Sequence, residues 1–238
     1  MQRYMVYNKD LKLDIDDVKH IINVMRMKEN EIFEIVYNKT IYTCKITYID
    51  RKDVKYEIIK EDKKEKNRKN KVIIAPSLIK EQKMDYLLQK STELGVDEII
   101  PLISERTVIK INEKKDNKLS RWSKILKEAS EQSFRIDTPK IHEITRLKDI
   151  IKYDADLKIV CDTLEMSKNI KKVLQDSKKS DTILIVVGPE GGFTKNEVDY
   201  LSDNGFIRTS LGKNILRAET VPLFLLSVIN YEFEVDLW

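Results

Sequence analysis

The stretch VVGPEGGFTKNEV, residues 186–198, packs three of the chain's six glycines into five positions. It overlaps the end of the apolar run 183–187, which has the length and composition of a buried strand. Thr194 and Glu197 have the T-x-x-E spacing of a capping box, which predicts that a helix begins just after the loop. Glycine is used where the backbone needs positive φ or close approach to another group. The stretch therefore predicts a strand, a closely approached turn and a helix.

A glycine-rich loop between a strand and a helix is where phosphate-binding loops occur, but the residues that hold phosphates are missing here. The loop contains no G-x-x-x-x-G-K-[ST] motif, so it lacks the Lys and Ser/Thr that bind phosphates and magnesium. Its glycines also differ in spacing from G-x-G-x-x-G. Glu190 would repel a phosphate at the mouth of the loop. The spacing alone allows a plain tight turn, whereas a ligand that is neutral or positively charged at its centre suits the loop better.

A second loop combines glycine with charged side chains. The segment LGKNILRAET, residues 211–220, follows the next expected strand and places Arg217 and Glu219 beside an apolar Ile-Leu pair. A third loop, residues 161–165, follows another expected strand. Ligands of open parallel sheets bind at the carboxyl ends of the strands. We therefore expect the two glycine loops to open onto one crevice.

Residues 72–238 alternate between apolar runs and helical patterns. Fully apolar strands that alternate with helices are typical of a parallel sheet covered on both faces. Gly95 stands at the position of a helix C′ residue, which predicts the end of the first of these helices. The expected strands are 72–75, 98–103, 157–160, 183–187 and 206–211, and the expected helices are 84–94, 118–133, 167–175, 195–203 and 219–231. The second part of the chain is therefore predicted to be an α/β domain.

The first 60 residues have the pattern of a small β domain. Alternating stretches rich in β-branched and aromatic residues predict strands at 3–7, 31–37, 41–49 and 54–59. Asn38-Lys39 supplies a two-residue hairpin turn between the second and third strands. One helix is expected at 15–27, with a single apolar face made of Ile15, Val18, Ile21, Ile22 and Met25. These strands predict a small β-barrel, which buries them without leaving edges.

The distribution of charge separates the two parts of the chain. Residues 60–71, KEDKKEKNRKNK, hold seven basic and three acidic side chains. The net charge is +5 over residues 1–71 and −1 over residues 72–238. The run is interpreted as a solvated linker or as a contribution to phosphate binding, and both can hold together. The changes in pattern and charge predict a basic β domain of residues 1–71 and an α/β domain of residues 72–238.

Composition limits the class of protein further. No apolar run approaches the roughly 18 residues that span a membrane, and the N-terminus has no apolar signal segment. Cys44 and Cys161 lie far apart, which fits a reducing cytoplasm rather than a disulfide framework or a zinc site. Only two histidines, His20 and His142, are present. We therefore expect a cytoplasmic protein without a membrane segment or a metal cofactor.

Several motifs together resemble one family. GPEGGF at 188–193 and ILRAET at 215–220 resemble the RsmE family, the 16S ribosomal RNA uridine N3-methyltransferases of the SPOUT superfamily. HIINVMRMKENEIFEI at 20–35, QKSTELGVDEIIPLISERTV at 89–108 and EASEQSFRIDTPKI at 128–141 resemble family segments in the same order. The resemblance implies a PUA-like β-barrel followed by a SPOUT α/β domain with a parallel sheet and a deep trefoil knot. It also implies S-adenosylmethionine as the methyl donor, 16S ribosomal RNA of the small ribosomal subunit as the substrate, and a homodimer.

The resemblance also implies roles for particular residues. The three loops would bind the cofactor through backbone groups, and side chains beyond hydrogen at 191 and 192 would occupy ligand space. The implied cofactor-binding residues are Leu164, Gly188, Pro189, Glu190, Gly191, Gly192, Leu211, Gly212, Ile215, Leu216 and Arg217. Arg217 is expected to stabilise the uracil anion, and Glu190 or Glu219 to accept its proton. Arg135 is expected to contact the base or RNA phosphate, and His20 and Arg26 to contact RNA.

Other interpretations of these residues and of the whole chain remain open at this point. Arg217 could instead form a salt bridge with Glu219 or Glu190, Arg135 could be an ordinary surface residue, and His20 could be structural. A SPOUT enzyme that methylates a ribose 2′-hydroxyl would have the same core, although the basic first domain and the EQSFR segment favour uridine N3. A non-enzymatic RNA-binding or ribosome-assembly factor is the alternative from a different class, against which the intact GPEGG and ILRAET segments argue.

The last expected helix, 219–231, is apolar nearly all round. Such a helix must be buried on several sides, and a sheet covers only one of them. We therefore expect a second subunit to cover part of it, with deeper burial within one chain as the alternative.

Overall fold

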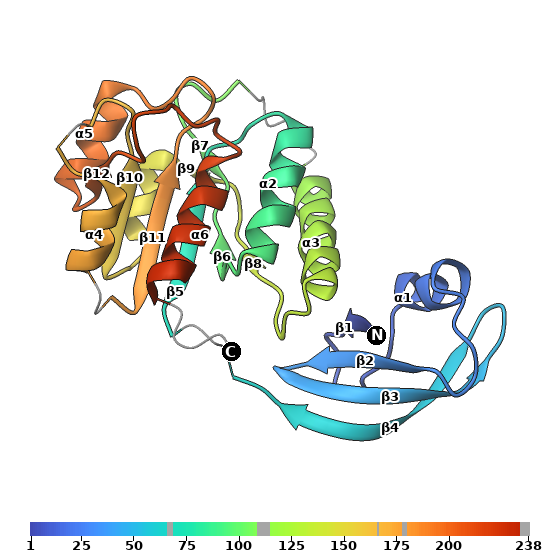
Figure 1. Ribbon diagram of the computed structural model, residues 1–238. Coiled ribbons are helices and arrows are strands. Elements are labelled where there is room, and N and C mark those ends of the chain that lie inside the picture. Colours follow the sequence, from blue (N-terminus) through green and yellow to red (C-terminus); the bar gives the residue numbers. More distant parts are fainter. Residues whose placement is uncertain (66–68, 109–114, 166, 178–179, 234–238) are drawn as a thin grey trace. The chain divides into compact units, whose positions relative to one another are not determined.

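We describe a computed structural model of the chain, in which residues 1–65, 69–108, 115–165, 167–177 and 180–233 are described. The chain forms two compact units, and the colours of Figure 1 follow the sequence through both of them. The first comprises Met1–Lys66 and Lys127–Thr138, and the second Asn67–Leu126 and Pro139–Trp238. The contacts thus group the segment 127–138 with the first unit, whereas a single boundary after residue 71 leaves this segment in the second domain. The division into functional domains at that boundary stays a prediction.

The first unit contains a four-stranded sheet in the order β1-β2-β3-β4. Its strands are β1 (Gln2–Met5), β2 (Ile32–Tyr37), β3 (Thr40–Ile49) and β4 (Val54–Lys63). β1 runs parallel to β2, and the other neighbours are antiparallel. Asn38 and Lys39 both have positive φ, 48° and 63°, so the predicted hairpin turn between β2 and β3 is confirmed. Among the described residues no ladder joins β4 to β1, so closure into a barrel stays a prediction.

The helix of the first unit differs from the predicted one. Helix α1 (Ile15–Lys19) is short, and the chain continues as a π-helix, His20–Val24. A face drawn at α-helical spacing does not continue through a π turn, because each π turn contains more residues. Ile21 is fully buried, whereas Ile15 and Met25 are exposed. The predicted single apolar face is therefore wrong at its two ends.

The charged run after residue 59 is not a linker throughout. β4 continues to Lys63, and its residues 60–63 pair with Thr40–Thr43 of β3. β4 is an edge strand, where charged side chains remain in water and discourage pairing with other chains. Residue 71 already belongs to β5 (Lys71–Pro76) of the second unit. The linker interpretation can hold only between these two strands, and residues 66–68 there lie outside the described residues.

The second unit is built on a six-stranded sheet in the order β12-β10-β11-β5-β6-β8, with all neighbours parallel. Its further strands are β6 (Glu98–Ile99), β8 (Lys140–Ile141), β10 (Leu157–Cys161), β11 (Thr182–Val187) and β12 (Ile207–Thr209). Its helices are α2 (Glu81–Glu93), α3 (Lys115–Gln132, counted with the first unit from residue 127), η2 (Leu147–Lys152, a 3-10 helix), α4 (Ile170–Asp176), α5 (Lys195–Asp203) and α6 (Val221–Phe233). The predicted parallel α/β architecture is confirmed.

One predicted strand, 98–103, is broken into two. β6 ends at Ile99, and β7 (Leu102–Ile103) pairs with β9 (Thr145–Arg146) in a separate two-stranded sheet. Pro101 lies in the break and has no N–H to donate to a ladder. The apolar run is therefore continuous in sequence but divided between two sheets.

Alternate residues of the central strand β11 face opposite sides of the sheet. Residues 183, 185 and 187 pack in one core with apolar side chains of α2, α4 and α6. Residues 184 and 186 pack in a second core with side chains of η2 and α5. All of β11 after its first residue is buried. Helices thus cover both faces of the sheet, as predicted (Figure 1).

Helix α6 is buried within the chain on the side that meets α2 and α4. Its buried residues are Val221, Pro222, Leu225, Leu226 and Ile229. The stripe Phe224, Val228 and Tyr231, spaced i, i+4 and i+7, is only partly covered, and Tyr231 is 89% exposed. Deeper burial within one chain therefore accounts for one face of this helix but not for this stripe.

Two further observations concern the class of protein. No helix within the described ranges is long and apolar enough to cross a membrane. In the same part of the chain, no three or more His, Cys, Asp or Glu side chains gather where they could hold a metal ion.

Candidate active site

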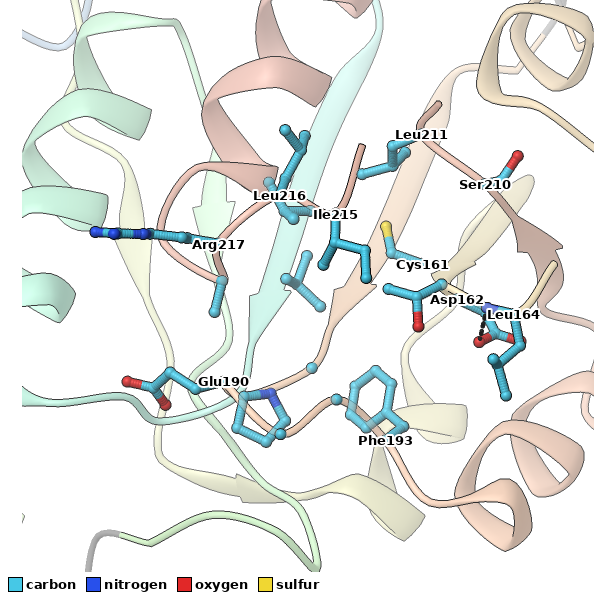
Figure 2. Close-up of a pocket in the computed structure, with 18 of the residues that line it drawn as sticks. Cys161, Asp162, Leu164, Glu190, Phe193, Ser210, Leu211, Ile215, Leu216 and Arg217 are labelled. Carbon is cyan, nitrogen blue, oxygen red and sulfur yellow. Dashed lines mark hydrogen bonds between the residues drawn. The ribbon is translucent and has the colours of Figure 1, made fainter. Parts of the chain in front are cut away.

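Three loops meet at the carboxyl edge of the sheet because the strands that precede them are neighbours. β12, β10 and β11 are adjacent and parallel, so their carboxyl ends lie side by side. The loops that follow these strands, 161–164, 188–193 and 210–217, line one cavity of about 530 Å³ (Figure 2). The expectation that both glycine loops open onto one crevice is therefore confirmed, and the third loop joins them.

The glycine loop is closed on itself. A Cβ at Gly188 would lie 3.2 Å from the backbone C and Cα of Gly192 and from the backbone N of Phe193. Gly192 has a φ of 66°, and its N–H donates to the carbonyl of Pro189 at 2.8 Å. The close approach that the glycines indicate is thus, at Gly188, an approach of the loop to its own backbone. A Cβ at Gly191 would meet only the Arg106 side chain, at 3.5 Å.

The segment before residue 108 holds this loop from outside, and sequence reasoning did not single it out. Arg106 Nη1 donates to the carbonyl of Gly191 at 2.7 Å. The backbone N–H of Glu105 donates to Glu197 Oε1 at 2.7 Å. Glu197 also closes the capping box with Thr194 at the start of α5, as predicted. The glycine loop and the helix after it therefore share one set of anchors.

The loop after β12 carries an apolar and a charged side chain in succession. Ile215 is 82% exposed and faces the cavity with Leu216 and Leu211 (Figure 2). Arg217 is exposed, and its guanidinium has no hydrogen bond or ion pair with any described residue. The salt bridge from Arg217 to Glu190 or Glu219, the structural alternative, is therefore absent from the described part of the chain.

The two candidate carboxylates pair with a residue that the sequence did not indicate. Lys83 Nζ lies 3.3 Å from Glu190 Oε1 and 3.5 Å from Glu219 Oε2. Lys83 comes from α2, and it lines the cavity together with Glu190 and Arg217. Glu219 is buried and is not among the residues that line the cavity.

The third loop is fixed by a buried carboxylate. Asp162 accepts a hydrogen bond from Arg208 Nη2 at 2.7 Å. It also accepts one from the backbone N–H of Leu164 at 3.0 Å, drawn as a dashed line in Figure 2. Leu164 itself is 77% exposed beside the cavity. Burial raises the pKa of the Cys161 thiol to about 12, so this cavity-lining side chain is neutral. The loop thus presents the uncharged side chains of Cys161 and Leu164 to the cavity, and Asp162 holds its backbone at Leu164.

The predicted RNA-contacting residues belong to the first unit. His20 Nδ1 lies 3.0 Å from the Tyr4 hydroxyl, which gives His20 a structural contact. Arg135 Nη2 donates to Asp137 at 2.8 Å. Arg26 is exposed and has a φ of 52°. The roles in RNA binding and catalysis assigned to these residues stay predictions.

The EQSFR segment carries a buried acid in the first unit. Glu131 Oε1 accepts a hydrogen bond from the backbone N–H of Met5 at 2.8 Å and lies 3.7 Å from Lys127 Nζ. Burial raises the pKa of Glu131 to about 7 and outweighs the Met5 hydrogen bond and the Lys127 charge, with Asp17 acting in the same direction as burial. Sequence reasoning considered this segment for RNA contact and not for packing.

Glu131 is expected to make the first unit less stable as the pH rises. The pKa of this carboxyl group is about 7 in the folded unit and 4.5 in the unfolded chain. Its contribution to the free energy of unfolding is therefore fully present below pH 4.5 and is lost as the pH rises through about 7. The full effect is about 3 kcal/mol. The free energy of unfolding is measured in urea at pH 5 and pH 8. At pH 8 it should be higher for Glu131→Gln than for the unmodified chain, because the variant has no carboxylate to bury. Glu128→Gln, an exposed change in the same helix, is the control, and equal pH dependence in all three proteins would contradict the assignment.

Comparison with known proteins agrees with this arrangement. A family model described as an RNA methyltransferase domain matches residues 65–230, and one described as an RNA methyltransferase PUA domain matches residues 13–59. Together with the three-loop cavity at the edge of a parallel sheet, these matches define an RNA methyltransferase with a PUA domain.

Relatives narrow the class to one family. "Ribosomal RNA small subunit methyltransferase E" of Bacillus subtilis is 35% identical over 92% of this chain and 89% of the relative. The protein of the same name from Mesomycoplasma hyopneumoniae is 33% identical over 87% and 88%. The crystal structure of such an enzyme from Neisseria gonorrhoeae bound to S-adenosyl methionine has 29% identity and a TM-score of 0.86, with 98% of each chain covered. The chain belongs to the ribosomal RNA small subunit methyltransferase E family.

Proposed function

We propose that the chain transfers the methyl group of S-adenosylmethionine to N3 of a uridine in 16S ribosomal RNA of the small ribosomal subunit. The observation that carries the proposal is the cavity formed by the three loops at the carboxyl edge of the sheet, in a chain whose relatives act on small-subunit ribosomal RNA. A cytoplasmic location, where the chain would meet ribosomal RNA, belongs to the proposal. The deep trefoil knot of SPOUT enzymes is part of the same proposal.

The lining of the cavity fits S-adenosylmethionine. Its walls combine backbone of the glycine loop with exposed apolar side chains such as Ile215 and Leu164. Such walls suit an adenosine and a methionine chain, which carry no phosphate. Glu190 at the cavity would attract the positive sulfonium rather than repel it. When bound, the cofactor would supply an electrophilic methyl group, and it would leave as neutral S-adenosylhomocysteine as the sulfur–methyl bond breaks.

The chain's own residues have three tasks in this reaction. The loops must position the uracil and the methyl group in line, which supplies much of the acceleration. A base must take the proton as the N3–H bond breaks and the bond from N3 to the methyl carbon forms. Of the two candidate carboxylates only Glu190 lines the cavity, so we assign the proton to Glu190. The guanidinium of Arg217, which pairs with none of the described residues, stabilises the negative charge that develops on the uracil.

The proposal is tested by mapping the product. The purified protein is incubated with S-adenosylmethionine and small subunits or 16S ribosomal RNA from cells that lack the protein, and the nucleosides are analysed by mass spectrometry. We expect a methylated uridine whose extra mass stays with the base when the glycosidic bond breaks. A methyl group on the ribose would support the 2′-hydroxyl alternative. Absence of cofactor binding in calorimetry would support the non-enzymatic alternative.

A homodimer through α6 is part of the proposal. The partly covered stripe Phe224, Val228 and Tyr231 lies on one face of the helix, and its Tyr231 side chain is exposed. We expect the double substitution Val228→Lys and Tyr231→Lys to give a folded monomer with little methylation activity. Light scattering and melting temperature measure this, and a variant that remains dimeric would contradict the surface. Ile229→Lys would not test the dimer surface, because Ile229 is fully buried and a charge there would destabilise the unit itself.

A further inference from the structure

One lysine joins both candidate carboxylates beside the cavity. Lys83 Nζ lies within 3.5 Å of Glu190 and of Glu219, which come from two different loops. The Lys83 side chain is one-third exposed, Glu190 is similar, and Glu219 is largely buried. One cation on α2 thus connects the glycine loop after β11 with the loop that follows β12.

Glu219 depends on this lysine more than Glu190 does. Glu219 Oε2 is buried and makes no hydrogen bond within the described residues. Lys83 is the cation that the described structure places within ion-pair distance of it. A carboxylate that is buried without a partner is strongly disfavoured. Removing the Lys83 charge therefore leaves the Glu219 carboxylate without its cation and favours an ion pair with another cation nearby.

Arg217 is the cation in position to respond. It precedes Glu219 by two residues, and its guanidinium is exposed and unpaired in the described part of the chain. Figure 2 shows its side chain extending away from Leu211 and Cys161, on the Glu190 side of the cavity. Guanidinium groups pair readily with carboxylates through their fixed fork of donors. Pairing would remove Arg217 from the cavity.

We propose that Lys83 is a positioning residue, which holds Glu190 and Glu219 so that Arg217 stays free to act on the substrate. The inference rests on the proposed function, in which Arg217 stabilises the uracil anion. It assigns to α2 the task of supplying the cation for both carboxylates, because the cation in the loop after β12, Arg217, would otherwise pair with them and would no longer be free.

The experiment compares three substitutions in the full chain. Lys83→Met removes the charge, Lys83→Arg retains it, and Lys90→Met removes the Lys90–Glu93 ion pair of the same helix, away from the cavity. Phenylglyoxal modifies free guanidinium groups, and peptide mass spectrometry gives the rate at Arg217. An exposed ion pair shifts such an equilibrium by about two- to fivefold. We expect Lys83→Met to slow modification of Arg217 and to lower kcat/KM for methylation by this same factor, with Lys83→Arg and Lys90→Met close to the unmodified chain.

The outcomes separate this inference from the proposed function. A purely structural Lys83 would lower the melting temperature and leave the modification rate of Arg217 unchanged, which would overturn the inference. Failure of the unmodified chain to bind S-adenosylmethionine in calorimetry would overturn the proposed function, while the modification rates would still report on Lys83. If Lys83→Met does not fold, Lys83→Gln carries the same comparison, because it also removes the charge.

Discussion

Gly188→Val is expected to weaken the binding of S-adenosylmethionine roughly ten- to hundredfold, because an overpacking cost of about 1–3 kcal/mol falls on the loop conformation that binds the ligand. The reason lies in the loop itself. A Cβ at this position already meets three backbone atoms at 3.2 Å, and backbone cannot move aside as a flexible side chain can. Valine adds two methyl groups to that contact, so the turn must open and carry Gly191 and Gly192 with it. Isothermal titration calorimetry with S-adenosylmethionine measures the loss.

A pair of alanine substitutions separates two explanations for the glycines. In Gly188→Ala the new methyl group meets backbone at 3.2 Å, whereas in Gly191→Ala it meets the Arg106 side chain at an ordinary 3.5 Å. If the loop needs glycine because it packs against its own backbone, Gly188→Ala loses more affinity for S-adenosylmethionine than Gly191→Ala. An equal or larger loss in Gly191→Ala would show that the loop needs glycine because a side chain would occupy the space of the ligand. Melting temperatures of both variants must stay close to that of the unmodified chain for the comparison to hold.

Local sequence patterns predicted the secondary structure correctly where one short segment determines its own conformation. Helix α5 begins after Thr194 and ends at Asp203 as predicted, because the capping box and the apolar spacing lie within the helix itself. The turn at Asn38-Lys39 and the fully apolar strand β11 are of the same kind. Their conformations depend on neighbours in the chain, which the sequence displays directly.

Elements that depend on distant residues were not predictable in the same way. The run 98–103 looks like one strand, and only the pairing of β7 with β9 reveals that it serves two sheets. Glu131 lies in the predicted helix 118–133, yet its contact with the backbone N–H of Met5 forms only in the folded unit. No local pattern encodes these contacts, because their partners lie far apart in the sequence.

The candidate site shows the same division. Glycines, Arg217 and both carboxylates stand out in the sequence because they cluster beside expected strand ends. Lys83 and Arg106 lie on other elements, and each acts through one or two contacts with loops that are more than 80 residues away along the chain. The sequence signal for Arg106 was limited to the SERT segment within a family resemblance, and Lys83 had none.

Arg217→Ala is expected to lower kcat for methylation about 10²- to 10³-fold, the loss typical of removing one donor that stabilises developing negative charge. Affinity for S-adenosylmethionine should change much less, because Ile215, Leu216 and the backbone of the glycine loop remain in the cavity. An interaction made only in the transition state lowers kcat and kcat/KM together. The expected signature is therefore a loss in both kinetic constants at nearly constant cofactor affinity.

Two further variants make this expectation specific to Arg217. Arg217→Lys keeps the charge but not the fork of donors, so partial activity is expected. Arg146→Ala removes an exposed arginine of the same unit that does not line the cavity, and it should keep the activity of the unmodified chain. Single-turnover methylation of small subunits and calorimetry with S-adenosylmethionine provide the two measurements. If Arg217→Ala instead loses cofactor affinity in proportion to its activity, Arg217 binds the cofactor and another group stabilises the uracil anion. If activity and affinity are both unchanged, the cavity beside Arg217 is not where the uracil reacts.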